Sequence, residues 1–264
     1  MAVTDPQHDR FQYIQSRISS NRVFPRGTPT VSQEDRQAVI FNFISSAESR
    51  EANADISALV IAGWTGRDAV AVQHHIDELA RLGVPAPSRV PLYYRASAHL
   101  LTQESAIEVV GAETSGEAEP ALLAAAGQLW VGVGSDHTDR KAEAFSVALS
   151  KQLCAKPLAR TLWRFVDVAP HWDELMLRSW AVINGKRVLY QEGRLALIRP
   201  PLELVRGYTI QNAELAAGTA MFCGTLTAIG GVRPASRFEM QLEDPVLKRE
   251  IRHSYEVSAL PVVS

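Results

Sequence analysis

Short apolar segments separated by turn residues follow one another along most of the chain, and they indicate a fold made mainly of β-strands. The run ISALVIAGW (56–64) is apolar almost throughout, which is typical of a buried strand. Strands outnumber helices and do not alternate regularly with them, so we predict an α+β, mostly β fold rather than a doubly wound sheet. Further strands are predicted at 90–94, 106–111, 129–134, 162–168, 177–183, 219–224, 237–242 and 251–257.

The segment 67–87 is predicted to be a helix with one apolar face. Val72, Ile76 and Leu79 recur at helical spacing, and Gly83 can end the helix. The prolines that follow Gly83 prevent the helix from continuing.

A second helix is predicted over 138–153, with Thr138 as a plausible N-cap. Its apolar stripe is expected to consist of Ala142, Phe145, Ala148 and Leu149.

The organisation along the chain suggests one large domain preceded by a polar segment. The chain has 264 residues, a length at which mixed and β-rich folds are often single domains. We place an N-terminal arm or small element at 1–55 and the main domain at 56–264.

Composition and charge exclude several classes of function. The net charge of −2 offers no basic excess for nucleic acid or an anionic membrane surface, and no apolar run is long enough for a membrane span. Neither GxGxxG after a strand nor a phosphate-binding P-loop is present. Cys154 and Cys223 make no disulfide framework, and the N-terminus does not read as a secretory signal, so we expect a cytoplasmic protein.

Glu117 and Glu119, in SGEAEPALL, are two residues apart and would point to one face of an extended segment. Two carboxylates so close repel each other unless one is protonated or a cation neutralises them. Their hard oxygen atoms suit Mg²⁺ or Mn²⁺, with Ca²⁺ as a further option. The alternative is a solvated turn between two elements.

The segment LWVGVGSDHTDRK presents Asp136, His137, Asp139 and Arg140 where a predicted strand passes into a helix. Such junctions often carry functional groups. One of the two aspartates could instead cap the helix. His137 could bind a metal, although a lone histidine is more often an ordinary polar residue.

His75 and Glu78 are three residues apart and therefore lie on one face of the predicted helix. A carboxylate beside an imidazole raises the basicity of the ring, which is the arrangement of a general base. A surface hydrogen bond is the simpler alternative. His74 is rotated by about 100° from His75 on an ideal helix.

Lys151 and Lys156 lie among apolar residues in LSKQLCAKPLA. A lysine in such a setting can stabilise an oxyanion. Either lysine could also simply favour the end of a helix through the macrodipole.

The order of these pieces resembles the fumarylacetoacetate hydrolase superfamily, and more closely its DUF2848-like group. The resemblance covers roughly residues 56–258. It rests on HHIDELARLGVPAPSRVPLYYR (74–95), Glu117-Ala-Glu119, the run 135–140, Lys151 followed by Pro157, and Gly224-Thr225 in LAAGTAMFCGTLTAIGG.

The resemblance implies a mixed β-sandwich roll and a homodimer, with a divalent metal held by Glu117, Glu119 and Asp136. It implies catalytic roles for His75, Glu78 and Lys151. Substrate-binding roles fall on Tyr94, Arg95, Arg140, Glu143 and Thr225. Arg95 departs from the family's frequent lysine, and Glu143 stands where many members carry glutamine.

The activity implied by the resemblance is hydrolysis of a C–C bond in a small oxo or diketo acid, such as an acylpyruvate, with an enolate leaving group. The same scaffold also hosts decarboxylases, tautomerases and dehydratases of 2-oxo acids, which need the same metal site. A non-enzymatic protein that binds a small acid is a further alternative.

Overall fold

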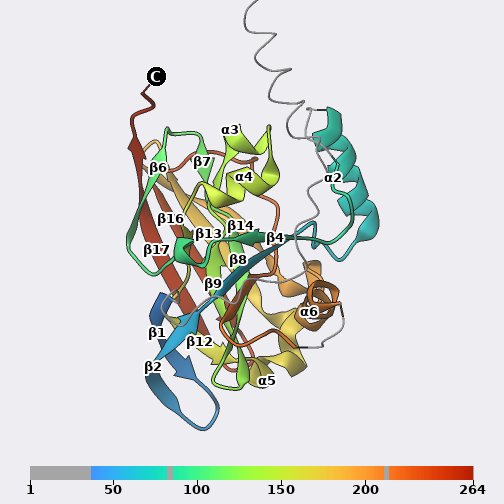
Figure 1. Ribbon diagram of the computed structural model, residues 1–264, viewed down its shortest axis with the longest axis vertical. Helices are drawn as coiled ribbons and strands as arrows, with labels where there is room; N and C mark the ends of the chain where they lie inside the picture. Colours follow the sequence, from blue (N-terminus) through green and yellow to red (C-terminus); the bar gives the residue numbers. More distant parts are fainter. Residues whose placement is uncertain (1–36, 82–85, 211–213, 264) are drawn as a thin grey trace, which may run out of the picture. The chain divides into compact units, whose positions relative to one another are not determined.

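The computed structural model describes residues 37–81, 86–210 and 214–263, and most of their regular structure is β-strand (Figure 1). The mostly β fold with few helices is therefore confirmed. No helix among the described residues combines the length and the apolar character needed to span a bilayer.

The larger sheet has eight strands in the order β2-β1-β12-β9-β8-β15-β3-β4. β1 pairs with β12 and β15 pairs with β3 in parallel, and the other neighbours are antiparallel. The strands are β1 (Gln37–Ile44), β2 (Ser49–Ile56), β3 (Ala58–Gly63), β4 (Leu92–Ala96), β8 (Ala118–Ala125), β9 (Gln128–Ser135), β12 (Thr161–Arg164) and β15 (Thr219–Phe222).

The larger sheet curls strongly, and the chain itself requires this. β2 lies at one edge and β3 is next to the other edge, yet only Ser57 separates the two strands in sequence. A link of one residue cannot cross a flat sheet of this width, because neighbouring strands are about 4.8 Å apart. The two ends of the sheet must therefore approach each other, as in a roll.

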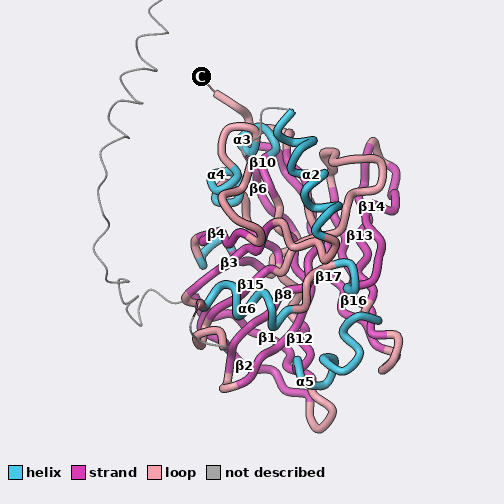
Figure 2. The backbone as a smooth tube through the Cα atoms, turned by 90° about the vertical axis from the view of Figure 1, so that its right-hand side faces the viewer, coloured by secondary structure: helices cyan, strands magenta, loops and turns pink. Residues whose placement is uncertain are grey.

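The smaller sheet has five strands in the order β14-β13-β16-β17-β6 and packs against one face of the larger sheet (Figure 2). Its strands are β6 (Ala106–Val110), β13 (Met176–Ile183), β14 (Lys186–Arg194), β16 (Arg237–Asp244) and β17 (Arg249–Leu260). Two short ladders complete the β-structure, formed by β10 (Thr138–Asp139) with β7 (Thr114–Ser115) and by β11 (Lys156–Pro157) with β5 (Leu101–Thr102).

The core consists of two apolar clusters on opposite faces of the larger sheet. Leu122 of β8 faces the smaller sheet and joins a cluster that includes Phe238 and Leu242. Its neighbour Leu123 points into the curl, where it joins Phe41 and other buried side chains. Because side chains alternate along a strand, β8 stabilises both clusters at once. β8 is buried along its whole length, which fixes the position of the residues at its start.

The helices are short and lie at the ends and edges of the sheets (Figure 1). They are α2 (Ala69–Arg81), α3 (Arg140–Glu143), α4 (Val147–Gln152), α5 (Phe165–Val168) and α6 (Pro201–Thr209), with single turns at Ala98–Leu100, Ala169–Glu174 and Leu195–Leu197. α2 confirms the helix predicted at 67–87, and Asp68 caps it by accepting from Val70 N and Ala71 N. Gly83, its predicted end, lies outside the described residues.

The single helix predicted over 138–153 is wrong, because the chain forms two short helices there. Thr138 is a strand residue of β10 and not an N-cap. Asp139 caps α3 and Ser146 caps α4 through side-chain oxygens that accept from backbone N–H groups. The predicted apolar stripe is also wrong, since Phe145 is 77% and Leu149 43% exposed.

Other differences concern strands. The strand predicted at 162–168 ends at Arg164, where α5 begins. The sequence patterns missed β8 and β14. The arm or small element was placed at 1–55; residues 37–55 of that range form β1 and most of β2 in the larger sheet, and 1–36 lie outside the described residues.

Candidate metal centre

The pairing of β8 with β9 brings the three predicted carboxylates together. Glu117 comes directly before β8 and Asp136 directly after β9, at the open end of an antiparallel pair in which Ala118 faces Ser135. The N–H of Asp136 donates to the carbonyl of Glu117 over 3.0 Å. Glu119 follows two residues later on the same side of β8. Carboxylate oxygens of Glu117, Glu119 and Asp136 lie within 4.8 Å of one another.

A close approach of the backbone holds Glu119 in place. Its Oε2 accepts a hydrogen bond of 2.8 Å from the N–H of Gly224. Gly224 has a φ of +95°, and a Cβ there would lie 1.7 Å from Oγ1 of Thr65. Only glycine combines this conformation with this contact. The Gly224-Thr225 motif therefore positions a carboxylate of the centre.

Three cationic side chains, those of Arg140, Lys151 and Lys156, lie against the carboxylates. Nζ of Lys151 lies 2.5 Å from Oδ2 of Asp136 and 3.3 Å from Oε2 of Glu117. Nζ of Lys156 lies 3.3 Å from Oδ1 of Asp136 and donates to the carbonyls of His137 and Cys154. Both oxygens of Asp136 thus face an ammonium group.

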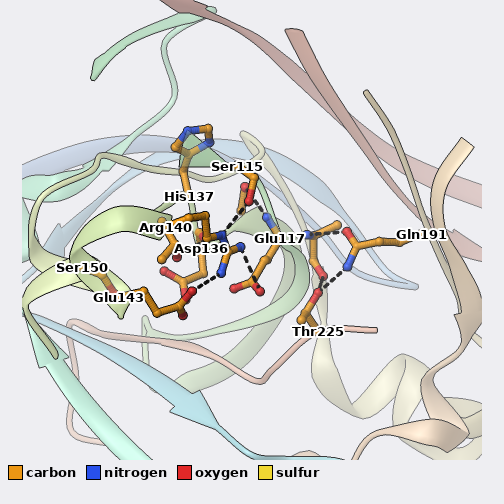
Figure 3. Close-up of polar contacts among 12 residues, drawn as sticks. Ser115, Glu117, Asp136, His137, Arg140, Glu143, Ser150, Gln191 and Thr225 are labelled. Carbon is orange, nitrogen blue, oxygen red and sulfur yellow. Dashed lines mark hydrogen bonds and ion pairs between the residues drawn. The ribbon is translucent and has the colours of Figure 1, made fainter. Parts of the chain in front are cut away.

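Arg140 connects two carboxylates at the more exposed end of the centre. Its Nη1 donates to Oε2 of Glu143 over 2.8 Å, and its Nη2 lies 3.1 Å from Oε1 of Glu117. Its Nε donates to Oγ of Ser115 over 2.7 Å. Figure 3 shows the guanidinium between the two glutamates. Each of the three nitrogens of Arg140 therefore faces a neighbouring side chain.

The pKa values of the two glutamates shift in opposite directions. Burial by itself would raise the pKa of Glu117, but Arg140 and Lys151 lower it to about 2. Burial and the charges of Asp136 and Glu117 raise the pKa of Glu119 well above its ordinary value. Glu117 is thus ionised, whereas Glu119 needs either a proton or a further cation.

These residues fit a divalent metal ion. Three convergent carboxylates are the hard oxygen ligands that Mg²⁺, Mn²⁺ and Ca²⁺ prefer, and a cation beside Glu119 would remove the cause of its raised pKa. Lys151 competes for Oδ2 of Asp136, so a metal ion would have to displace its ammonium group from that oxygen.

A buried chain of hydrogen bonds supports the segment that carries Asp136. The ring nitrogens of His137 lie 2.9 Å from Oη of Tyr255 and 2.9 Å from Oγ1 of Thr114. Oη of Tyr255 lies 2.8 Å from Oγ of Ser135, which accepts from the N–H of Glu117. Burial lowers the pKa of His137 to about 3, with help from Lys156 and Arg140, so its ring is neutral. With both nitrogens engaged by hydroxyls, His137 supports the segment and is not aimed at the metal centre.

Gln191 of β14 supports the other side of the centre with all of its hydrogen-bonding capacity. Its Oε1 accepts from the N–H of Ala118 and from Ser179, and its Nε2 donates to Oγ1 of Thr225 and to the carbonyl of Leu226. Ala118 lies between the two glutamates, so Gln191 fixes the backbone that carries both. Sequence reasoning missed Gln191 and Tyr255 because neither belongs to a motif, and only strand pairing reveals their positions.

Comparisons with known proteins place this chain in a family. The model of the family described as "Protein of unknown function (DUF2848)" matches residues 62–255. The chain belongs to the DUF2848 family. No curated protein matches it.

Solved structures show that this DUF2848 protein has the fold of fumarylacetoacetate hydrolase-like proteins. A protein of Burkholderia cenocepacia, provisionally assigned as a fumarylpyruvate hydrolase, is 20% identical with a TM-score of 0.56, over 89% of this chain and 100% of that chain. The 5-carboxymethyl-2-hydroxymuconate delta-isomerase of Mycobacterium smegmatis is 16% identical, with a TM-score of 0.57 over 81% and 82%. A 2-keto-3-deoxyarabinonate dehydratase is 14% identical, with a TM-score of 0.58 over 80% and 76%.

The side chains predicted to bind substrate in the DUF2848 protein lie at different distances from the carboxylates. Glu143 is in the network itself, through Arg140 and Lys151. Burial raises the pKa of Tyr94, with smaller contributions from the charges of Lys151, Glu143 and Asp136. A role for Tyr94 in substrate binding stays a prediction. Thr225 donates to the carbonyl of Ala118 over 2.7 Å.

Arg95 points to the other face of β4. Its Nη1 donates to Oη of Tyr208 in α6 over 3.0 Å. Because neighbouring side chains alternate along a strand, Arg95 and Tyr94 point in opposite directions. A role for Arg95 in substrate binding stays a prediction.

The predicted general base, His75 with Glu78, lies on α2. His75 lies within this helix, and its side chain lies outside the described residues. Oε1 of Glu78 lies 3.5 Å from Nδ1 of His74, which is one turn away on the helix. The His75–Glu78 dyad therefore stays a prediction.

The sequence left open whether Asp136 or Asp139 caps a helix, and the structure shows which of them does. Oδ1 of Asp139 accepts from the N–H of Ala142 over 2.8 Å, so Asp139 is the helix cap. Asp136 is thereby left for the centre. Lys156, which the sequence left undecided, is wholly buried against Asp136.

Proposed function

We propose that this protein is a divalent-metal-dependent hydrolase that cleaves a C–C bond in a small oxo or diketo acid of the acylpyruvate type. The observation that carries the proposal is the convergence of Glu117, Glu119 and Asp136 within 4.8 Å, in a setting with three cationic side chains. Mg²⁺ and Mn²⁺ are the proposed ions. Such an ion, when bound, acts as a Lewis acid on the oxygens of the substrate, an effect of several kcal/mol.

In the proposed reaction, His75 with Glu78 takes a proton from water, and the resulting hydroxide adds to the carbonyl at C4 of the acylpyruvate. The C3–C4 bond then breaks, C4 leaves as a carboxylate, and the electron pair passes to C3 as the enolate of pyruvate. A proton returned to C3 completes the reaction. Positioned acid–base groups of this kind contribute about 10²–10⁴-fold.

Lys151 and Arg140 stabilise the negative charge that develops in this reaction. Both lie at the carboxylates, and both are cationic: Asp136, Glu117 and Glu143 raise the pKa of Lys151 in spite of its burial. Fixed positive charges in a site with little water stabilise an enolate better than bulk water does.

Decarboxylase, tautomerase and dehydratase activities on 2-oxo acids are the alternatives, since all of them need a stabilised enolate. Two of the structural neighbours are an isomerase and a dehydratase, and these activities belong to those proteins. The likeness, below 25% identity, extends to the fold alone. A non-enzymatic protein that binds a small acid is the second alternative.

The test is a turnover screen of acylpyruvates and related oxo acids with Mg²⁺ or Mn²⁺ in H₂¹⁸O. One ¹⁸O atom in the released carboxylate supports hydrolysis. Turnover without ¹⁸O incorporation points to decarboxylation, tautomerisation or dehydration. Tight binding of an acid without turnover supports the binding protein. Glu113→Gln serves as a control, because the side chain of Glu113 is exposed.

The proposal also includes a homodimer and a cytoplasmic location, both carried over from the sequence. The homodimer rests on the family resemblance. Light scattering coupled to size-exclusion chromatography tests it directly, since a mass of about 58 kDa is expected, twice the 29.0 kDa of one chain.

A further inference from the structure

The carboxylate of Glu143 lies at the exposed end of the metal centre. The side chains around the triad become less accessible in order: Glu143 is 26%, Glu117 18% and Lys151 9% exposed, whereas Asp136 is only 1% exposed. Glu143 is therefore the carboxylate of the centre that is most open to solvent.

Glu143 also forms an ion pair with Arg140, a side chain that could otherwise bind the carboxylate of an acidic substrate. Arg140 carries the only guanidinium among the ion pairs of the centre, within the described residues. Its Nη1 donates to Glu143, its Nη2 faces Glu117, and its Nε donates to Ser115. A guanidinium binds a carboxylate best through two parallel N–H groups, and all three nitrogens of Arg140 already face another group.

The charge balance of the centre supports a substrate with a single negative charge. Four carboxylates (Glu117, Glu119, Asp136 and Glu143) face three cationic side chains (Arg140, Lys151 and Lys156), which leaves one net negative charge. A divalent ion changes this to one net positive charge. One substrate carboxylate then neutralises the site, and a second would place an unbalanced negative charge beside the carboxylate of Glu143, which repels it.

We infer that Glu143 makes this site selective for 2-oxo acids with a single carboxylate and disfavours those with a second carboxylate. The inference rests on the proposed function and narrows its substrate class. Among acylpyruvates, it selects those with an uncharged acyl group. Glu143 acts as a specificity-determining residue, through its own charge and through its hold on Arg140.

Two ligands of equal length test this selectivity. 2-Oxopentanoate and 2-oxoglutarate have the same carbon chain and differ in the terminal carboxylate. Their dissociation constants are measured calorimetrically with saturating Mg²⁺ for the natural protein, Glu143→Gln and Glu113→Gln. Glu113→Gln is the matched control, because it removes the same charge from an exposed side chain near α3.

The natural protein is expected to bind 2-oxopentanoate about tenfold more tightly than 2-oxoglutarate, as for two unit charges roughly 6 Å apart at an effective dielectric constant of about 40. Glu143→Gln is expected to remove most of this preference, because it deletes the negative charge and so weakens the hold on Nη1 of Arg140. Glu113→Gln is expected to retain it.

The outcomes separate the inference from the proposed function. If both acids bind the natural protein equally, or if Glu143→Gln keeps the full preference, the inference is wrong and the 2-oxo acid site stands. If neither acid binds in the presence of Mg²⁺, the proposed function fails and the inference fails with it. A melting temperature of Glu143→Gln close to that of the natural protein confirms that the variant is folded.

Discussion

Nζ of Lys151 lies 2.5 Å from Oδ2 of Asp136, so an ammonium group sits on one of the oxygens that a metal ion would use. The charge that aids the proposed reaction therefore weakens metal binding. We expect Lys151→Met to bind Mg²⁺ about tenfold more tightly, because a competing positive charge is removed. Turnover is expected to fall. Titration calorimetry with Mg²⁺ checks this prediction. Lys141→Met is the control, because Lys141 is exposed and lies on α3. Weaker Mg²⁺ binding by Lys151→Met than by the natural protein would contradict the prediction.

Asp136 is expected to be essential for stability as well as for metal binding. Asp136→Asn leaves Lys151 and Lys156 without their shared carboxylate, and Lys156 is 0% exposed. Removal of one partner from a buried ion pair typically costs about 3–5 kcal/mol. Chemical denaturation in the presence of a chelator measures this loss. Glu51→Gln, which breaks an exposed pair with Arg160, should cost less than about 1 kcal/mol; equal losses in both variants would refute the account.

The raised pKa of Glu119 should make the stability of the metal-free protein depend on pH, and a bound metal ion should remove this dependence. Burial and its acidic neighbours raise the pKa of Glu119 in the folded protein above the ordinary value of 4.5. The folded state therefore holds a proton that the unfolded state has released. Stability without metal falls as the pH rises above about 4.5 until the folded pKa is reached, by up to about 1.4 kcal/mol per pH unit.

Thermal unfolding from pH 4.5 to 8 in a chelator tests this sign. The melting temperature of the natural protein should fall relative to that of Glu119→Gln, which cannot titrate at this position. With Mg²⁺ present, the melting temperature of the natural protein should no longer fall with rising pH relative to that of Glu119→Gln. A melting temperature that rises with pH relative to Glu119→Gln would show that Glu119 is already ionised without metal.

The hydroxyl of Tyr255 is expected to matter for the metal centre although it touches none of the carboxylates. It joins His137 to Ser135, and Ser135 accepts from the N–H of Glu117. Tyr255→Phe should cost about 1–2 kcal/mol of stability and weaken Mg²⁺ binding by about tenfold. Tyr190→Phe also removes a buried hydroxyl, one that accepts from the N–H of Arg233, and should leave Mg²⁺ binding unchanged. Equal Mg²⁺ binding by the two variants would remove Tyr255 from the support of the centre.

The strands and the acidic triad could be predicted because each depends on local rules. Alternation along a strand put Glu117 and Glu119 on one side, and the junction after an apolar strand marked Asp136. The strand β8 was missed because Ala118–Ala125 contains alanines and a proline, and therefore lacks the β-branched and aromatic residues typical of strands. Its burial between two clusters makes it a strand in spite of its composition.

The error at 138–153 has a different cause. Apolar residues at helical spacing indicated one continuous helix with a buried stripe. Instead Asp139 and Ser146 each cap a separate short helix, and Phe145 stays exposed. This break lets Arg140, Glu143 and Lys151 converge on the carboxylates from two helices. The contributions of Tyr255 and Gln191 depend on pairing between distant strands, which periodicity does not report.

The most direct test is the position of a bound metal ion in crystals grown with saturating Mn²⁺, located by its anomalous scattering. We predict one ion bound by oxygens of Glu117, Glu119 and Asp136, each at about 2.0–2.3 Å, with the ammonium group of Lys151 moved away from Oδ2 of Asp136. A Mn²⁺ ion bound elsewhere, or no ion at these three carboxylates at saturation, would contradict it.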